Sequence, residues 1–324
     1  MSNPFKSWVG ILGVVLVSFG VATIVFVTTD GDPVGVFLTL FLFISYLLPC
    51  ATNILATLKY RIEERPGLFW LWPGLIMVAL VSYDLYFRVG LDSSLLKVCY
   101  LLMPLALIRI SGFSKEKKGF PGFAIILAIL MVWLPVDAGV IQATFPWPPG
   151  LGGNLYAIPI GVFVLVYGLS VVKGLDMGFT VRPVEGLLVT VVVNYLLFIS
   201  FAIPVGTILG FIGFNPVAPI SRFLEIVVPT IFLVAVPEEL LFRGVIQNYL
   251  RKSIKKVFWA DLTSAVIFGL AHLNNGSEPD LRYGLLSTVA GYFYGRAYVK
   301  TGNLIPAVMV HAAVDLTWAC FFKV

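Results

Sequence analysis

The chain has 324 residues, of which 59% are hydrophobic and only 12% are charged. Soluble domains carry about 25% charged residues, so this composition excludes an ordinary soluble protein. The formal net charge of +5 is modest and the basic residues lie mostly in loops, which suits a membrane surface and gives no support to nucleic-acid binding.

The hydrophobic residues are grouped in long blocks that predict membrane-spanning helices. Many blocks run for roughly 17–25 residues, the length of helix that crosses about 30 Å of hydrocarbon. The predicted fold class is therefore all-α, a polytopic transmembrane bundle of about eleven spans. No cleavable signal peptide is expected, because the first block is long and no small-residue cleavage site follows it. The predicted spans are residues 8–28, 34–57, 68–88, 95–111, 121–136, 155–172, 186–212, 222–248, 259–274, 282–299 and 304–322.

The positions of lysine and arginine predict the orientation of these spans. With the N-terminus in the cytoplasm, most of the 22 lysines and arginines fall on the inner side. The expected inner loop 111–120 has three lysines, whereas the expected outer loops 28–33 and 136–154 have no basic residue. We therefore expect a multi-pass protein of the plasma (inner) membrane, with its N-terminus inside and its C-terminus outside.

The first 180 residues carry few polar groups within the predicted spans. Asp84 is the exception, and because Tyr86 follows it near the expected outer interface, partial solvation of Asp84 is expected. The three cysteines are far apart and predict neither a disulfide framework nor a thiolate zinc site. We predict an N-terminal transmembrane region of unknown role, residues 1–180, followed by a domain that carries the polar site, residues 181–324.

The first polar group inside a predicted span is in VPEELLFRGV, residues 236–245. A charge within a span costs roughly 2.5–3.5 kcal/mol on insertion scales, so it marks a candidate functional residue. Glu239 and Arg243 are spaced i, i+4 and share a helix face, which predicts an ion pair. Glu238 points about 100° away on the helix and is left as the free carboxylate, which makes it the better candidate base.

Both histidines of the chain lie in later spans. His272 follows Phe268 by four residues, so the two share a helix face. His311 and Asp315 have the same spacing, so the carboxylate could fix the imidazole tautomer, or both could ligate one metal ion. Helical rise places Glu238, His272 and His311 in the inner half of one bilayer. Small residues such as Gly269 and Ala312 allow the helices to approach closely, and one shared site is predicted.

Carboxylates and histidines screened from bulk water favour the activation of water for amide hydrolysis. A desolvated glutamate can take a proton near neutral pH, and a histidine can share that water or bind a zinc ion that acidifies it. The second histidine could donate a hydrogen bond to a developing oxyanion. We expect a catalytic set of Glu238, Glu239, His272, His311 and Asp315, with Arg243 as a structural ion-pair partner. Zinc, the one cofactor considered, would be held by Glu238, His272, His311 and Asp315.

Three motifs in this order resemble those of the CPBP intramembrane proteases, a family that includes the CaaX prenyl endopeptidases and bacteriocin-processing relatives. EELLFR (238–243) resembles E-E-x-x-x-R, FGLAH (268–272) resembles F-x-x-x-H, and HAAVD (311–315) resembles H-x-x-x-N/D. The resemblance covers about residues 185–322. It implies a helical-bundle endopeptidase with a membrane cavity open toward the cytoplasm.

The resemblance also implies roles for the site residues. Glu238 would activate water with His272, while His311 and the residue at 315 would stabilise the oxyanion. The prenyl-protease branch typically has asparagine at the last position, where this chain has Asp315. An ionised aspartate cannot donate to an oxyanion, so Asp315 is expected to orient His311 or to ligate a metal. A glutamate mechanism and a zinc mechanism both stay open.

Two other functions use the same polar groups. A transporter or channel would relay protons or bind an ion through them, and the repeated halves that would support this are not found in the sequence. A non-catalytic relative acting in peptide immunity would keep the fold without needing the acid and both histidines, whose presence favours an enzyme. The expected partners are membrane lipids and a membrane-anchored or prenylated protein or peptide substrate, with no nucleic acid.

Overall fold

The computed structural model describes residues 54–86, 88, 90–112, 122–141, 157–180, 183–216, 223–275 and 278–323, with scattered positions before residue 54. The predicted spans 8–28 and 34–57 and the predicted loops 28–33, 111–120 and 136–154 lie wholly or mostly outside the described residues. The chain forms two compact units, one containing the described residues up to Asp176 and the other continuing from Met177. The functional roles assigned to the two regions stay predictions.

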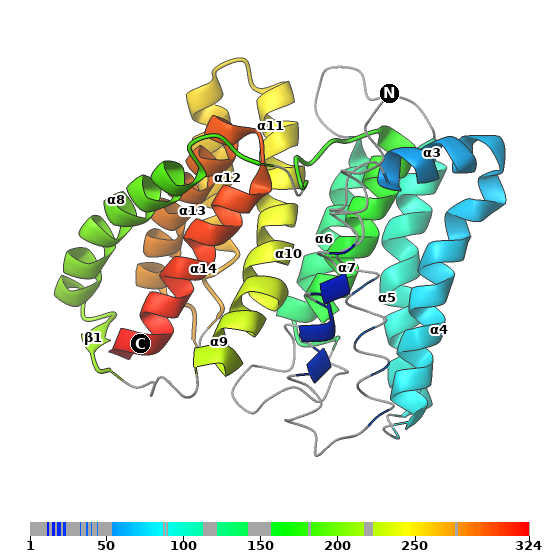
Figure 1. Cartoon of the computed structure of the whole chain (residues 1–324), viewed down its shortest axis with the longest axis horizontal. Helices are drawn as coiled ribbons and strands as arrows, with labels where there is room; N and C mark the ends of the chain where they lie inside the picture. The colour runs from blue at the N-terminus through cyan, green and yellow to red at the C-terminus, as the bar shows by residue number, and fades with distance from the viewer. Residues whose placement is uncertain are drawn as a thin grey trace. The chain divides into compact units, whose positions relative to one another are not determined.

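The described residues are almost entirely helical, which confirms the all-α fold class (Figure 1). The helices that are long and apolar enough to cross a membrane are Pro66–Tyr86, Leu187–Ile208 and Leu304–Phe321. Shorter apolar helices are Phe123–Asp137, Ala157–Lys173 and Val257–Leu270. These lengths and compositions fit a helical membrane bundle. The count of eleven spans and their orientation stay predictions.

The first unit is built from helices α3 to α7, and α5 packs against both α6 and α7. Helix α3 carries several charged residues, and only its first turn overlaps the predicted span 34–57. The described elements are α3 (Ile54–Glu64), a 3₁₀ turn (Pro66–Trp70), α4 (Leu71–Tyr86), α5 (Leu91–Ile110), α6 (Phe123–Asp137) and α7 (Ala157–Gly168), which continues as a π-helical turn (Leu169–Lys173).

A buried ion pair joins α4 to α5 in this unit. The ammonium of Lys97 lies 3.1 and 3.0 Å from the two carboxylate oxygens of Asp84, and the hydroxyl of Ser94 donates to the same carboxylate at 2.8 Å. Asp84 is completely buried. The expectation that Asp84 is partly solvated is therefore wrong. Its partners come from the next helix, and the pattern of residues within a single span does not reveal such contacts.

The second unit contains the three motifs. Its strands β1 and β2 pair antiparallel, with Gly213 opposite Lys323 and Phe214 opposite Phe322, so the chain after α8 meets the end of α14 (Figure 1). The elements are α8 (Leu187–Ile208), β1 (Gly213–Phe214), α9 (Phe223–Pro229), α10 (Val236–Glu239), α11 (Asn248–Ser253), α12 (Val257–Leu270), α13 (Leu281–Thr301), α14 (Leu304–Phe321) and β2 (Phe322–Lys323). The π-helical segments Thr230–Ala235 and Leu240–Gln247 join α9, α10 and α11 into one continuous helix.

A proline accounts for the widened helix before the first motif. Pro237 has no amide hydrogen to donate, and its ring crowds the carbonyl group four residues earlier, that of Leu233. Leu233 lies in the π-helical segment Thr230–Ala235, where the wider turn moves that carbonyl aside. Isolated π-helical turns are frequent at functional sites. This one leads directly into α10, which carries Glu238.

Helices α12 and α13 approach each other very closely through Gly269. A Cβ atom at this position would collide with the hydroxyl of Thr288 and lie 2.5 Å from the carbonyl oxygen of Gly284. The predicted role of Gly269 in close helix packing is thereby confirmed. Because α13 also packs against α8 and α14, this close contact holds the centre of the second unit together.

We expect Gly269→Ala to destabilise the protein by about 1–3 kcal/mol, the range for overpacked cores. The carbonyl of Gly284 is backbone and cannot move aside without shifting α13. Gly74→Ala in α4 is the matched control, because a Cβ there would meet nothing within 4 Å, and alanine favours a helix more than glycine does. Thermal unfolding in detergent should show a lower melting temperature for Gly269→Ala but not for Gly74→Ala. Wild-type stability of that variant would contradict the close contact.

Candidate active site

Glu238, in α10, is the centre of a cluster of buried polar side chains. Its Oε2 lies 3.5 Å from Nε2 of His272 and 3.9 Å from Nε2 of His311. All three residues are buried, at 7%, 6% and 3% exposure. The predicted convergence of these side chains on one site is therefore confirmed. The distances slightly exceed direct hydrogen bonds, as is common in active sites without substrate.

His272 lies just after α12 and not within it. Helix α12 ends at Leu270 and His272 occupies the following turn, so the predicted span 259–274 extends too far. The ring Nδ1 is 2.8 Å from the carbonyl oxygen of Phe268. A carbonyl can only accept, so Nδ1 carries the proton and donates it. This bond satisfies one of the last carbonyls of the helix and leaves Nε2 as an acceptor facing Glu238.

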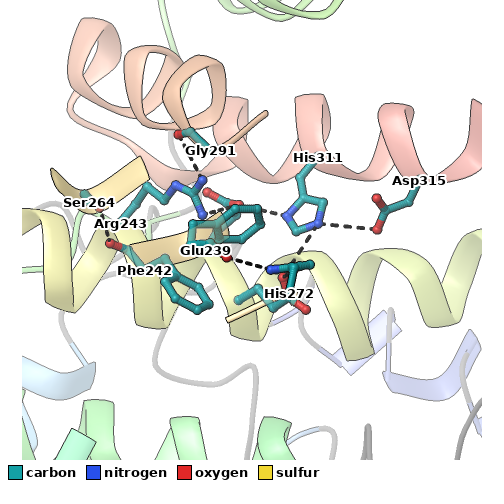
Figure 2. Close-up of polar contacts among 10 residues, drawn as sticks. Glu239, Phe242, Arg243, Ser264, His272, Gly291, His311 and Asp315 are labelled. Atoms are coloured by element: carbon teal, nitrogen blue, oxygen red, sulfur yellow. Dashed lines mark hydrogen bonds and ion pairs between the residues drawn. The ribbon is translucent and has the colours of Figure 1, made fainter. Parts of the chain in front are cut away.

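His311, in the middle of α14, has a carboxylate beside each ring nitrogen (Figure 2). Its Nδ1 donates to Oε1 of Glu239 at 2.8 Å, and its Nε2 lies 3.3 Å from Oδ2 of Asp315. The sequence spacing had suggested Asp315 as the residue that orients this ring. In the structure Glu239 holds Nδ1, while Asp315, whose side chain is 34% exposed, lies on the opposite side of the ring.

The predicted ion pair between Glu239 and Arg243 is confirmed. Arg243 Nη1 lies 3.0 Å from Glu239 Oε1, and Nη2 donates to the carbonyl oxygen of Gly291 in α13 at 3.0 Å. Glu239 is completely buried and Arg243 is 1% exposed. Glu239 therefore links Arg243 to His311, a connection visible in Figure 2.

The ring of Phe268 packs between the arginine and the histidines. Its centroid lies 4.3 Å from that of His272 and 5.8 Å from that of His311. The Arg243 guanidinium lies 4.3 Å from the same centroid, a cation–π contact. An apolar ring here keeps the local dielectric low and strengthens the neighbouring polar contacts. Phe268, from the second motif, thus packs against Arg243 of the first motif and His311 of the third.

A cavity of about 40 Å³ opens beside the histidines, with room for about three water molecules at roughly 10–15 Å³ each. Helix α13 supplies a wall that the sequence analysis missed, with hydroxyl groups from Tyr283, Ser287 and Tyr294. Their i, i+4 and i+11 spacing along one face of an apolar span is the signal that could have indicated them. The lining residues are Phe198, Phe268, His272, Tyr283, Leu286, Ser287, Ala290, Tyr294, His311, Val314, Asp315 and Trp318.

Polar contacts fix the start of α13 and therefore the position of this wall. Asp280 caps the helix by accepting a hydrogen bond from the backbone amide of Arg282 at 2.8 Å. The Arg282 guanidinium donates to the carbonyl oxygens of Leu209 and Gly210, at the end of α8, at 3.3 and 3.1 Å. Side-chain hydrogen bonds from Arg282 lower the pKa of Asp280 to about 2, so this carboxylate is ionised at neutral pH.

A metal site was one alternative for the same residues. Among the side chains that the structure describes, no group of three or more His, Cys, Asp or Glu residues is placed to hold a metal ion. The geometry therefore adds no support for a zinc site at Glu238, His272, His311 and Asp315, and the zinc mechanism stays a prediction.

The fold and the site together define a class of protein. A buried carboxylate in α10 lies beside two histidines that line a small cavity, an arrangement suited to hydrolysis within a membrane. Residues 220–317, which contain all three motifs, match the family model described as type II CAAX prenyl endopeptidase Rce1-like. The match of this segment supports the CPBP family predicted from the motifs. No curated protein and no solved structure matches the chain.

Proposed function

We propose that this protein is an intramembrane endopeptidase that hydrolyses a peptide bond of a membrane-anchored or prenylated protein or peptide, with Glu238 as the general base. The observation that carries the proposal is the position of Glu238 Oε2, 3.5 and 3.9 Å from Nε2 of His272 and His311. The match of residues 220–317 to a prenyl endopeptidase family supports the class of substrate.

A water molecule shared by Glu238 and His272 would be the nucleophile. Both facing atoms are acceptors, so the water can donate one hydrogen to each and direct a lone pair toward the substrate. As the water oxygen bonds to the carbonyl carbon, one proton passes to Glu238 and the carbonyl π electrons move onto oxygen. Glu238 then returns the proton to the amide nitrogen as the C–N bond breaks, which yields a carboxylic acid and an amine.

The chain of contacts from Arg243 through Glu239 to His311 would position this machinery. Glu239 holds Nδ1 of His311 at 2.8 Å and is itself held by Arg243 at 3.0 Å. Such supporting contacts fix both the tautomer and the orientation of a histidine. Asp315, 3.3 Å from Nε2, can exchange a proton with the ring as charge develops on the substrate.

A matched panel of peptides tests the proposed activity. Purified protein in nanodiscs is incubated with farnesylated, geranylgeranylated, transmembrane-anchored and unmodified soluble peptides of one sequence, and mass spectrometry identifies the products. We expect cleavage of membrane-associated peptides and none of the soluble peptide. Rates unchanged by a chelator support the glutamate mechanism, whereas a loss that added zinc restores supports metal assistance. The absence of product from every peptide would favour a transporter or a non-catalytic relative.

A further inference from the structure

Amide hydrolysis needs a hydrogen-bond donor aimed at the developing oxyanion, and the site described so far presents mainly acceptors. His272 donates from Nδ1 to Phe268, so its Nε2 is an acceptor when the ring is neutral, and His311 donates from Nδ1 to Glu239. Asp315 lies 3.3 Å from Nε2 of His311 and competes for any second proton that this ring carries. The site therefore requires another donor.

Tyr294, in α13, is placed to supply that donor. Its ring is stacked on the imidazole of His311, with centroids 4.6 Å apart and an angle of 18° between the planes. It is 2% exposed and lines the same cavity as His272 and Asp315. Among the hydrogen bonds of the described residues, none involves its hydroxyl. Buried tyrosine hydroxyls usually have a partner, so this one is suited to a partner that enters the cavity.

We infer that the Tyr294 hydroxyl donates a hydrogen bond to the carbonyl oxygen of the scissile bond as that oxygen becomes negatively charged. This inference rests on the proposed function. A phenol keeps its proton at neutral pH, so it donates whichever protonation state His311 adopts. The proton stays on Tyr294 throughout, and no covalent bond to the tyrosine forms or breaks. The stack on His311 holds the Tyr294 ring against a residue of the candidate site.

The two other hydroxyl residues of the α13 wall are less suited to this role. Tyr283 packs against Phe211, with ring centroids 5.4 Å apart, and meets His272 edge-on, so its ring does not stack on either histidine. Ser287 lies seven residues before Tyr294, about two helical turns away along α13. Tyr294 is the one of the three whose ring is stacked on His311.

Removal of the hydroxyl alone tests the inference, because Tyr294→Phe retains the ring and its stack on His311. We expect kcat to fall about 10²–10³-fold, the effect of losing one oxyanion donor, with KM and the melting temperature unchanged. Tyr292→Phe is the matched control. It makes the same change in the same helix, at a ring that packs on Phe293 outside the cavity lining, and should cleave at the wild-type rate.

A second measurement separates oxyanion binding from a structural effect. A peptide with a phosphonate in place of the scissile amide carries a tetrahedral anion and mimics the intermediate. Its affinity should fall about 10²-fold in Tyr294→Phe. The affinity for intact prenylated peptide, measured in the Glu238→Gln background, should not change when Tyr294→Phe is added. Weakened binding of the intact peptide together with a lower melting temperature would indicate a structural role and overturn the inference.

The remaining outcomes distinguish this inference from the proposed function. Wild-type kcat and wild-type phosphonate affinity in Tyr294→Phe, with Glu238→Gln inactive, overturn the role of Tyr294 and leave the endopeptidase proposal intact. A loss of kcat in Ser287→Ala with none in Tyr294→Phe would show that Ser287, and not Tyr294, is the donor, and would overturn the inference. Wild-type cleavage by Glu238→Gln overturns the proposed base and, with it, the mechanism on which this inference rests.

Discussion

Glu238→Gln is expected to lower kcat by about 10²–10⁴-fold, the contribution of a general base, while the protein remains folded. Glutamine has nearly the same shape as glutamate but cannot take a proton from water. The substitution should also leave folding intact, because Oε2 of Glu238 has no hydrogen-bond partner among the described residues. The carboxylate is therefore available for chemistry and is not a structural link.

Cleavage of a prenylated peptide and thermal unfolding, measured on the same preparation, check this expectation. Glu185→Gln is the matched control, since it makes the same change at an exposed residue just before α8, and it should leave both measurements at wild-type values. A Glu238→Gln protein that cleaves at the wild-type rate would show that the base lies elsewhere. A large drop in its melting temperature would show that Glu238 is a structural residue.

Arg243→Ala is expected to lower the free energy of unfolding by about 3–5 kcal/mol, the cost of breaking a buried ion pair. That is a large part of the roughly 5–15 kcal/mol that stabilises a typical domain, so the yield of folded protein and its melting temperature should both fall. The variant leaves the Glu239 carboxylate completely buried without its cation. It also removes the hydrogen bond to Gly291 and the packing on Phe268.

Arg251→Ala provides the matched comparison for this prediction. Arg251 lies 3.5 Å from Asp261, but the two side chains are 27% and 20% exposed, so the loss should be about 0–1 kcal/mol. Yield and thermal unfolding in detergent measure both variants. The double variant Glu239→Leu, Arg243→Met removes both buried charges and should recover part of the lost stability. A single variant Arg243→Ala as stable as wild type would refute the structural role of the pair.

The helices and several contacts of the site could be predicted from local sequence. The predicted spans 186–212 and 304–322 correspond closely to α8 and α14, because the length of an apolar block sets the length of a buried helix. The contacts Glu239–Arg243 and His311–Asp315 join residues four apart, and the helical repeat places such pairs side by side. Prediction failed at the end of α12, where the chain leaves the helix before His272 although the neighbouring Ala271 and Leu273 are apolar.

The sequence by itself therefore determined which residues share a face of each helix. The tertiary structure decided which of these faces pack against one another. Glu239 and His311 are 72 residues apart, and Asp84 and Lys97 belong to different helices. Nothing in the 3.6-residue repeat specifies how two helices rotate about their axes when they pack. That rotation follows from close contacts such as the one at Gly269, which brings α13 against α12. Packing of this kind placed the ring of Tyr294 on that of His311 and made α13 a wall of the cavity.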